Sequence, residues 1–114
     1  METDMHIPAQ FTGRWSGEIT DTTRKNPYSG EIIINADKVT TTYFMAQGTQ
    51  EGKLALHYES DGFLVLKETA ESFTGTLLLY LDAASKLKCV WHRGAKLNSE
   101  ATMTRIEQDN SKLT

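Results

Sequence analysis

The sequence predicts one all-β domain, an eight-stranded antiparallel β-barrel with up-and-down (meander) order. Eight segments alternate polar with apolar residues at a period of two and are rich in β-branched and aromatic side chains. Short runs of turn-forming residues separate most of them, so consecutive segments are expected to pair as antiparallel hairpins. A meander of eight strands would expose two edges, and closure into a barrel removes both. A two-sheet sandwich is the structural alternative.

The first four expected strands cover residues 11–20, 30–35, 39–46 and 53–59. In the first, Trp15 and Ile19 alternate with polar neighbours, which is the pattern of a strand with one buried face. An Asn-Pro-Tyr-Ser-Gly stretch precedes the second strand, Ala-Asp-Lys precedes the third, and a stretch with two glycines precedes the fourth. These residue types favour turns, so the chain is expected to reverse direction at each of them.

The last four expected strands cover residues 63–68, 72–81, 87–92 and 99–106. The sequences Ser-Asp-Gly, Thr-Ala-Glu, Asp-Ala-Ala-Ser and Arg-Gly supply the turns before them. No segment has a convincing amphipathic helical period. We therefore expect a lead segment at residues 1–10, a single barrel domain at residues 11–106 and a loose polar tail at residues 107–114.

Composition excludes several classes of partner. The 114 residues hold 12 Lys and Arg against 15 Asp and Glu, a formal net charge of -3, with neither sign gathered in a long run. Such a chain is not expected to bind nucleic acid or an anionic membrane. Residues 1–10 lack the pattern of a secretion signal, and the longest apolar run, residues 77–81, is too short for a membrane-spanning helix. Cys89 is the single cysteine, which fits a reducing compartment, so we expect a cytoplasmic protein.

Alternation along each strand predicts which side chains point into the barrel. Arg105 shares the face of the last strand that faces inward, as Trp15 does on the first. A buried guanidinium needs a partner, and the face of a tryptophan is a suitable one. We therefore expect Arg105 to close one end of the barrel by packing across Trp15, a structural role. The residues expected on the inner face are Phe11, Gly13, Trp15, Gly17, Ile19, Leu54, Leu56, Tyr58, Phe73, Gly75, Leu77, Leu79, Leu81, Leu87, Cys89, Trp91, Ala101, Met103 and Arg105.

The opposite end is expected to be open and rimmed by two longer loops, at residues 21–29 and 47–51. Eight strands enclose a space that side chains can fill or that can hold one small ligand. On the outer face, Leu78, Tyr80 and Val90 come from two adjacent strands and form an apolar patch. Contiguous exposed apolar surface marks an interface, so a homo-oligomer through the outer face of residues 78–90 is expected.

Catalytic and metal-binding patterns are not found in the sequence. His6, His57 and His92 are single residues on different segments, without metal-ligand spacing, and His57 and His92 are expected on the outer face. Cys89 is expected inside, where a thiol behaves as a small hydrophobe. The acidic residues are expected mainly in turns or on outward positions, so no carboxylate pair for acid–base chemistry is predicted. We expect no catalytic residue, no metal and no cofactor, and an enzyme is the least supported class.

Two short motifs resemble the calycin superfamily, which contains lipocalins, fatty-acid-binding proteins and avidins. The opening Phe-Thr-Gly-Arg-Trp, with Gly13 and Trp15, is similar to the Gly-x-Trp opening of lipocalins and avidins, and Arg105 lies where lipocalins carry an arginine on that tryptophan. The stretch Ser-Phe-Thr-Gly-Thr, followed by the strand with Trp91, resembles an avidin segment that leads to a biotin-contacting tryptophan. The resemblance implies a lipocalin-like or avidin-like barrel with Trp91 in the pocket. It does not extend to biotin, because Gly17 has no side chain where avidins carry polar biotin contacts.

These observations favour a non-enzymatic protein that binds a small apolar or aromatic ligand inside the barrel. Tyr43, Tyr58 and Trp91 are the expected ligand-binding residues, because an inward phenol needs a hydrogen-bond partner that a ligand can supply. The alternative is a protein-interaction or inhibitor module that uses the barrel as a scaffold and the outer patch or the loops as its binding surface. An enzyme would require two titratable groups that converge in the mouth of the barrel.

Overall fold

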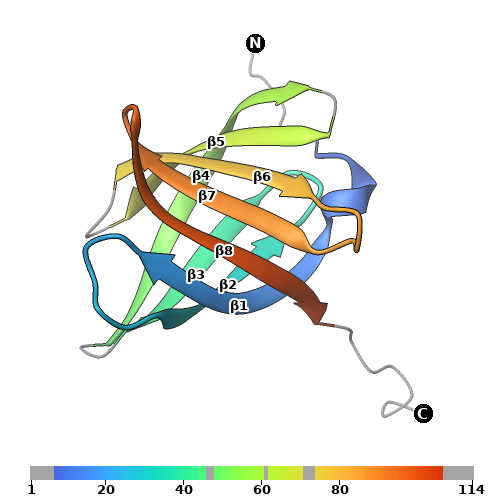
Figure 1. Ribbon diagram of the computed structural model, residues 1–114. Coiled ribbons are helices and arrows are strands. Elements are labelled where there is room, and N and C mark those ends of the chain that lie inside the picture. Colours follow the sequence, from blue (N-terminus) through green and yellow to red (C-terminus); the bar gives the residue numbers. More distant parts are fainter. Residues whose placement is uncertain (1–6, 46–47, 61, 71–73, 107–114) are drawn as a thin grey trace.

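The computed structural model describes residues 7–45, 48–60, 62–70 and 74–106, with the backbone alone at residues 57, 58, 60 and 70. Within these residues, eight strands form a closed barrel in sequence order, and all neighbouring strands are antiparallel (Figure 1). The predicted fold class is confirmed. The strands are β1 (Gly13–Asp21), β2 (Tyr28–Ile34), β3 (Val39–Met45), β4 (Gly48–Ser60), β5 (Phe63–Ala70), β6 (Thr74–Leu81), β7 (Leu87–Arg93) and β8 (Lys96–Ile106).

The barrel closes where its first strand meets its last. Trp15 on β1 lies opposite Ile32 on β2 and opposite Arg105 on β8, so β1 is hydrogen-bonded on both sides. Every strand therefore has two neighbours, which satisfies the backbone hydrogen bonds that an open meander would leave exposed at its edges.

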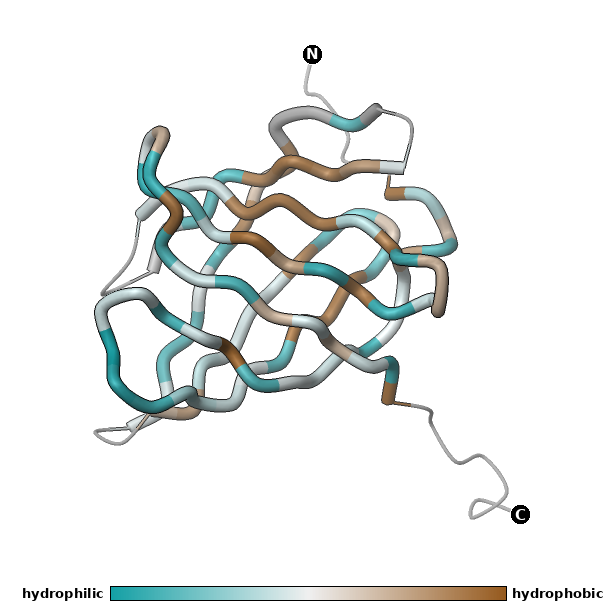
Figure 2. The backbone as a smooth tube through the Cα atoms, viewed as in Figure 1, coloured by the Kyte–Doolittle hydropathy of each residue, from teal (hydrophilic) through white to brown (hydrophobic). Residues whose placement is uncertain are grey.

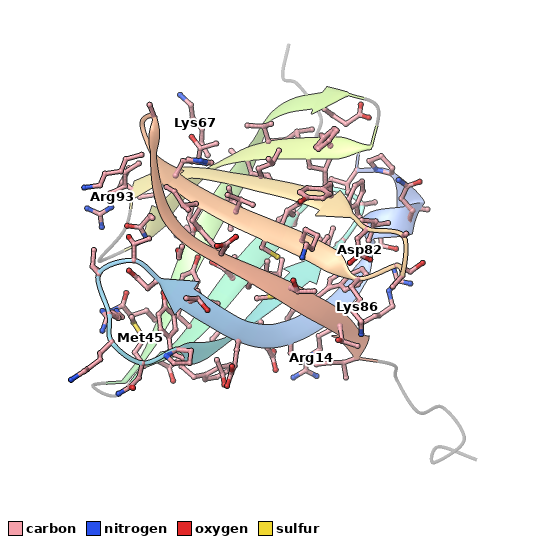
Figure 3. The ribbon with its side chains drawn as sticks, in the orientation of Figure 1. Arg14, Met45, Lys67, Asp82, Lys86 and Arg93 are labelled. Atoms are coloured by element: carbon pink, nitrogen blue, oxygen red, sulfur yellow. The ribbon has the colours of Figure 1, made fainter. Side chains whose placement is uncertain are left out.

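The two ends of the barrel differ. At the closed end, a short 3-10 helix, η1 (Ala9–Phe11), leads into β1, and β2, β4, β6 and β8 finish there. At the open end lie the β1–β2 loop (residues 22–27) and the β7–β8 turn. Figure 3 places Met45 and Arg93 at the open end and Arg14, Asp82 and Lys86 at the closed end.

Buried residues alternate with more exposed ones along β2, β3 and β7. Figure 2 shows the apolar residues as brown stretches of the backbone. Trp15 near the closed end and Trp91 near the open end are both buried, and leucine, isoleucine and methionine side chains fill the space between them. Burying one such aliphatic side chain stabilises the fold by about 1.5–3 kcal/mol relative to leaving it exposed. The fully buried large side chains are Phe11, Trp15, Ile19, Ile32, Ile34, Leu64, Leu66, Leu77, Leu79, Leu87, Trp91 and Met103.

Several expected boundaries are wrong. β2 begins two residues earlier than expected, β8 begins three residues earlier, and β5 ends two residues later. Phe11 does not begin the first strand: it ends η1, and its carbonyl accepts a 3.0 Å hydrogen bond from Nε1 of Trp15. The expected rim loop at residues 47–51 is also mostly strand, because Gly48 pairs with Met45 and Gln50 pairs with Tyr43. Gly48 and Gly52, which predicted a loop, belong to β4. This strand begins at Gly48, five residues before the start that its apolar pattern indicates.

In the part of the chain that the structure describes, there is no helix long and apolar enough to cross a membrane.

Candidate functional site

A cavity of about 370 Å³ opens at the open end of the barrel. It lies within the usual size range of pockets for small molecules, close to the lower limit. Its walls come from β1, the β1–β2 loop, β2, β3, β7 and β8. The lining residues are Asp21, Thr22, Thr23, Arg24, Tyr28, Tyr43, Met45, Trp91, Arg93, Lys96, Leu97, Asn98 and Ser99.

Three aromatic rings form one wall of this cavity. The ring centroids of Tyr28 and Tyr43 are 6.4 Å apart, and those of Tyr43 and Trp91 are 6.1 Å apart, both in edge-to-face geometry. Such contacts fix the orientation of each ring relative to the next. The wall is therefore a continuous and ordered aromatic surface.

The β1–β2 loop is held in place by its own polar groups. The carboxylate of Asp21 accepts hydrogen bonds from the backbone N–H (2.8 Å) and the hydroxyl (2.7 Å) of Thr23. The backbone N–H and the hydroxyl of Thr22 both donate to the carbonyl of Asn98, at 2.9 and 3.0 Å. These bonds extend the β1–β8 pairing one residue past Asp21 and fix the start of the loop.

A buried carboxyl group lies behind the aromatic wall. Glu68, on β5, is 1% exposed, and its carboxyl accepts hydrogen bonds from the hydroxyls of Thr41 (2.8 Å) and Tyr43 and from Nε1 of Trp91 (2.9 Å). Nε1 of Trp91 also lies 3.0 Å from the hydroxyl of Tyr43. Two of the three aromatic side chains of the wall are therefore anchored to one carboxyl group.

Gly52 makes room for this carboxyl. A Cβ atom at this position on β4 would clash with Oε2 of Glu68 and with the hydroxyl of Thr41. Thr41 and Gly52 are register partners, so the glutamate side chain crosses over the bare backbone of β4 to reach β3. Any larger residue at position 52 would separate the two partners.

Burial raises the pKa of Glu68, Tyr43 and Tyr28. Desolvation raises the pKa of Glu68, although the hydrogen bonds from Tyr43, Thr41 and Trp91 act in the opposite direction. Burial and the neighbouring Glu68 also raise the pKa of Tyr43, and burial together with Asp21 raises the pKa of Tyr28 to about 12. Both phenols therefore stay protonated at neutral pH, and each already donates to a carboxyl group, Tyr43 to Glu68 and Tyr28 to Asp21. The expectation that Tyr43 needs a ligand as its hydrogen-bond partner is wrong, because Glu68 fills that role.

The mouth of the cavity is cationic. Arg24, Arg93 and Lys96 line it, and Asp21 is the only carboxylate among the lining side chains that the structure describes. The Nε atom of Arg24 lies 3.8 Å from Asp21, and its guanidinium carbon lies 5.6 Å from the centroid of the Tyr28 ring. Among the described lining residues there are thus three positively charged side chains and one negatively charged side chain.

Of the three expected ligand-binding residues, the structure brings Tyr43 and Trp91 together in the cavity wall. Tyr58 is different: on β4 it lies eight residues beyond Gln50, the register partner of Tyr43, and towards the closed end. At about 3.4 Å per residue this corresponds to about 27 Å along the strand. The side chain of Tyr58 lies outside the described residues, as does that of His57.

The residues expected at the closed end lie side by side. The guanidinium carbon of Arg105 is 4.4 Å from the centroid of the Trp15 ring, and its Nη2 donates a 2.8 Å hydrogen bond to the carbonyl of Gln10. Gly13 has a φ of 134°, and a Cβ atom there would lie 3.1 Å from Nε of Arg105. The expectation that the arginine would be buried is wrong, because Arg105 stays exposed while it covers the buried indole.

The expected interface residues also share one surface. Leu78 on β6 is the register partner of Val90 on β7, and Tyr80 is two residues further along β6. All three are half-buried. Phe63 on β5 was not expected in this patch, yet it is 43% exposed and its ring centroid lies 5.4 Å from that of Tyr80. The outer patch is hereafter Phe63, Leu78, Tyr80 and Val90.

Acidic residues were expected mainly in turns or on outward positions, and Glu68 contradicts this expectation because its side chain is buried. Its position follows Leu64 and Leu66 at a spacing of two, so the alternation of β5 already places it on the inner face. Its charge suggested an outward position, and the three hydrogen-bond donors that compensate its burial come from distant parts of the sequence. Among the described residues, no three His, Cys, Asp or Glu side chains gather as metal ligands.

Comparison with known proteins identifies the fold. No protein-family model matches the chain, and no curated protein matches it. A solved structure of a redesigned β-barrel is similar over 87% of this chain and 94% of the designed one, with a TM-score of 0.71 and 16% sequence identity. At this identity the likeness concerns architecture alone, and it supports the eight-stranded antiparallel barrel.

Proposed function

We propose that this chain is a non-enzymatic binding protein that holds one compact apolar or aromatic ligand in the cavity at the open end. The single observation that carries the proposal is the cavity of about 370 Å³, with the rings of Tyr28, Tyr43 and Trp91 on one wall. Aromatic walls are typical of pockets for small molecules, and in this cavity the aromatic wall lies beside a mouth lined mainly by polar and charged side chains.

Preorganisation supports the same function. The Asp21 and Thr22 hydrogen bonds hold the β1–β2 loop, and the Glu68 carboxyl holds two of the rings, so a ligand would not have to order the site. Ordering costs subtract from affinity, and a preformed site avoids them. The motif resemblance to calycins, at Gly13, Trp15 and Arg105, is consistent with a ligand-binding barrel of that kind. The single buried thiol, Cys89, is consistent with a cytoplasmic location.

Native mass spectrometry of the freshly purified protein, beside its denatured spectrum, tests the proposal. We expect an additional small-molecule mass in the native spectrum that is lost on denaturation. Ser99→Trp would place an indole in the cavity, because Ser99 is buried and lines it. Thr102→Trp is the matched control, since Thr102 is exposed on the same strand. Retention of the additional mass by Ser99→Trp, or a protein that takes up no small molecule at all, would contradict the proposal.

The outer patch supports a second candidate, a protein-interaction module that includes self-association. Its motivating observation is the 43% exposure of Phe63 beside Tyr80 and the half-buried Leu78 and Val90. Sedimentation over a wide range of concentration tests it: we expect an oligomer that dissociates when Leu78 and Tyr80 are both replaced by serine. A monomer at all concentrations, with no stoichiometric partner in a pull-down, would exclude this candidate.

A further inference from the structure

Resting on the proposed function, we infer that Asn98 and Ser99 form a polar subsite of the cavity. This subsite binds a neutral group of the ligand that carries both a hydrogen-bond donor and a hydrogen-bond acceptor. A carboxamide on a compact aromatic body is the simplest chemistry that fits. The backbone of β8 and the hydrogen bonds of the neighbouring side chains both support this assignment.

A β-bulge brings two consecutive residues of β8 to the cavity. Trp91 pairs with Ser99, and the next pair is His92 with Leu97, so one residue of β8 is left between them without a register partner on β7. That residue is Asn98. Consecutive residues of a regular strand point to opposite faces, and a bulge interrupts this alternation and re-aims a side chain. Asn98 and Ser99 accordingly both line the cavity, and Nδ2 of Asn98 donates a 3.2 Å hydrogen bond to Oγ of Ser99.

The other uncharged polar side chains that line the cavity already donate hydrogen bonds within the protein. They are Thr22, Thr23, Tyr28, Tyr43 and Trp91, and their acceptors are the Asn98 carbonyl, the Asp21 carboxylate and the Glu68 carboxyl. The Ser99 hydroxyl differs, because it accepts from Asn98 and donates to none of the residues that the structure describes. Within the same residues, Oδ1 of Asn98 accepts no hydrogen bond.

The capacity that remains on this pair matches an amide. Ser99 is only 3% exposed, and a buried hydroxyl without an acceptor loses its hydrogen bond to water without compensation. A ligand carbonyl can accept from the Ser99 hydroxyl while a ligand N–H donates to Oδ1 of Asn98. A carboxylate only accepts and an ammonium group only donates, so neither satisfies both members of the pair.

The neighbours of Ser99 on the two adjacent strands support the same ligand chemistry. On β1 its register partner is Asp21, whose carboxylate also lines the cavity and would repel an anionic group placed here. On β7 its register partner is Trp91, which belongs to the aromatic wall together with Tyr43. The neutral polar group therefore binds at Asn98 and Ser99, and the aromatic body of the ligand lies against the rings of Trp91 and Tyr43.

Isosteric probes test this inference by isothermal titration calorimetry on the full chain. Benzamide offers a donor and an acceptor, acetophenone an acceptor alone and isopropylbenzene neither, and the corresponding 2-naphthyl compounds form a second series. In a series that binds, Ser99→Ala should weaken the amide and the ketone about fivefold, as the loss of one hydrogen bond would give. The same variant should leave the affinity of the hydrocarbon unchanged.

A second variant tests the acceptor of the pair. Asn98→Leu should weaken the amide about fivefold and leave the ketone and the hydrocarbon nearly unchanged. The backbone carbonyl of Asn98, which accepts from Thr22, is retained in this variant. Thr102→Ala is the matched control, because it removes an exposed hydroxyl from the same strand and should change none of the affinities.

The outcomes separate this inference from the proposed function. Equal changes for the amide, the ketone and the hydrocarbon in Ser99→Ala and Asn98→Leu would overturn the inference and leave a binding cavity. If no probe binds but the native mass spectrum contains an additional mass, a carboxamide-type molecule that Ser99→Ala no longer retains would support the inference, and a molecule without such a group would overturn it. Binding of no probe, together with a native spectrum without additional mass, would overturn the proposed function and this inference with it.

Discussion

Glu68 and Tyr43 are hydrogen-bonded to each other although they belong to strands that do not pair. Glu68 lies on β5 and Tyr43 on β3, and β4 runs between them. The contact crosses the backbone of β4 at Gly52, where a side chain would leave no space for it. One carboxyl group thereby joins the aromatic wall of the cavity to the opposite side of the barrel.

The raised pKa of Glu68 predicts a pH dependence of stability. Because the folded-state pKa lies above the unfolded-state value, the folded protein binds more protons in the interval between them, and stability falls as pH rises. The stabilising contribution is fully present below about pH 4.3, the ordinary value for glutamate, and is lost as the pH passes through the raised value. Relative to Glu68→Gln, the free energy of unfolding should fall by up to about 1.4 kcal/mol per pH unit in this interval.

Urea unfolding between pH 4 and pH 8 measures the difference in the free energy of unfolding between the unmodified protein and Glu68→Gln. The contributions of all other titrating groups are the same in the two proteins and cancel in this difference. Glu51→Gln is the control, since Glu51 is exposed on β4. The prediction fails if the difference between the unmodified protein and Glu68→Gln does not change with pH.

Gly52→Ala should destabilise the barrel by about 1–3 kcal/mol, because the added methyl group overpacks the site where Glu68 meets Thr41. The cost should be smaller in a Glu68→Ala background, where the obstructing carboxyl is absent. A double-mutant cycle by urea denaturation gives the coupling, which should be at least about 0.5 kcal/mol for residues in contact. Additive effects would show that position 52 and Glu68 do not interact.

Arg105→Ala should cost about 1–2 kcal/mol of stability, because it removes both the guanidinium over Trp15 and the hydrogen bond to the carbonyl of Gln10. Arg105→Lys should recover only part of this, since an ammonium group cannot stack on the indole. Arg14→Ala is the matched control: it breaks a surface ion pair to Glu31 at 3.3 Å, which should contribute less than about 1 kcal/mol. Thermal denaturation followed by circular dichroism ranks the three variants, and equal losses for Arg105→Ala and Arg14→Ala would contradict the prediction.

Cys89 should be inert in the native protein. Its thiol is fully buried, and burial raises its pKa, so very little thiolate is present at pH 8. A thiol-reactive disulfide reagent should therefore react only as the barrel opens, and one equivalent should react at once in denaturant. Thr102→Cys adds an exposed thiol as a positive control. Rapid labelling of Cys89 under native conditions would show that the interior is accessible near β7.

Strand positions and closure could be predicted because they depend on local patterns. The period of two identified every strand, and the shared inward face of Trp15 and Arg105 indicated their contact before the register was known. Local pattern also explains the errors. Phe11 fits the alternation of β1 yet belongs to η1, and glycines that favour loops occur inside β4, where Gly52 leaves space for other side chains.

The candidate site could be predicted only in part. Tyr43 and Trp91 were expected as inward aromatic residues, and both line the cavity. Glu68 was missed because burial of a carboxyl depends on its donors, which lie on β3 and β7 and become its neighbours only through the barrel register. The cationic mouth was missed for the same reason, since Arg24 and Lys96 are far apart in the sequence and meet at one end of the barrel.

The two tryptophans lie at opposite ends of the barrel, and this gives the protein two built-in optical probes. Trp15 lies beneath a guanidinium at the closed end, and Trp91 borders the cavity with its indole N–H engaged by Glu68. A ligand in the cavity should change the emission of Trp91 alone, whereas detachment of residues 7–11 should change that of Trp15. When one tryptophan at a time is replaced by phenylalanine, the emission of the other reports on its own end of the barrel. Ligand binding in the cavity and detachment of the chain before β1 can then be followed separately without an added label.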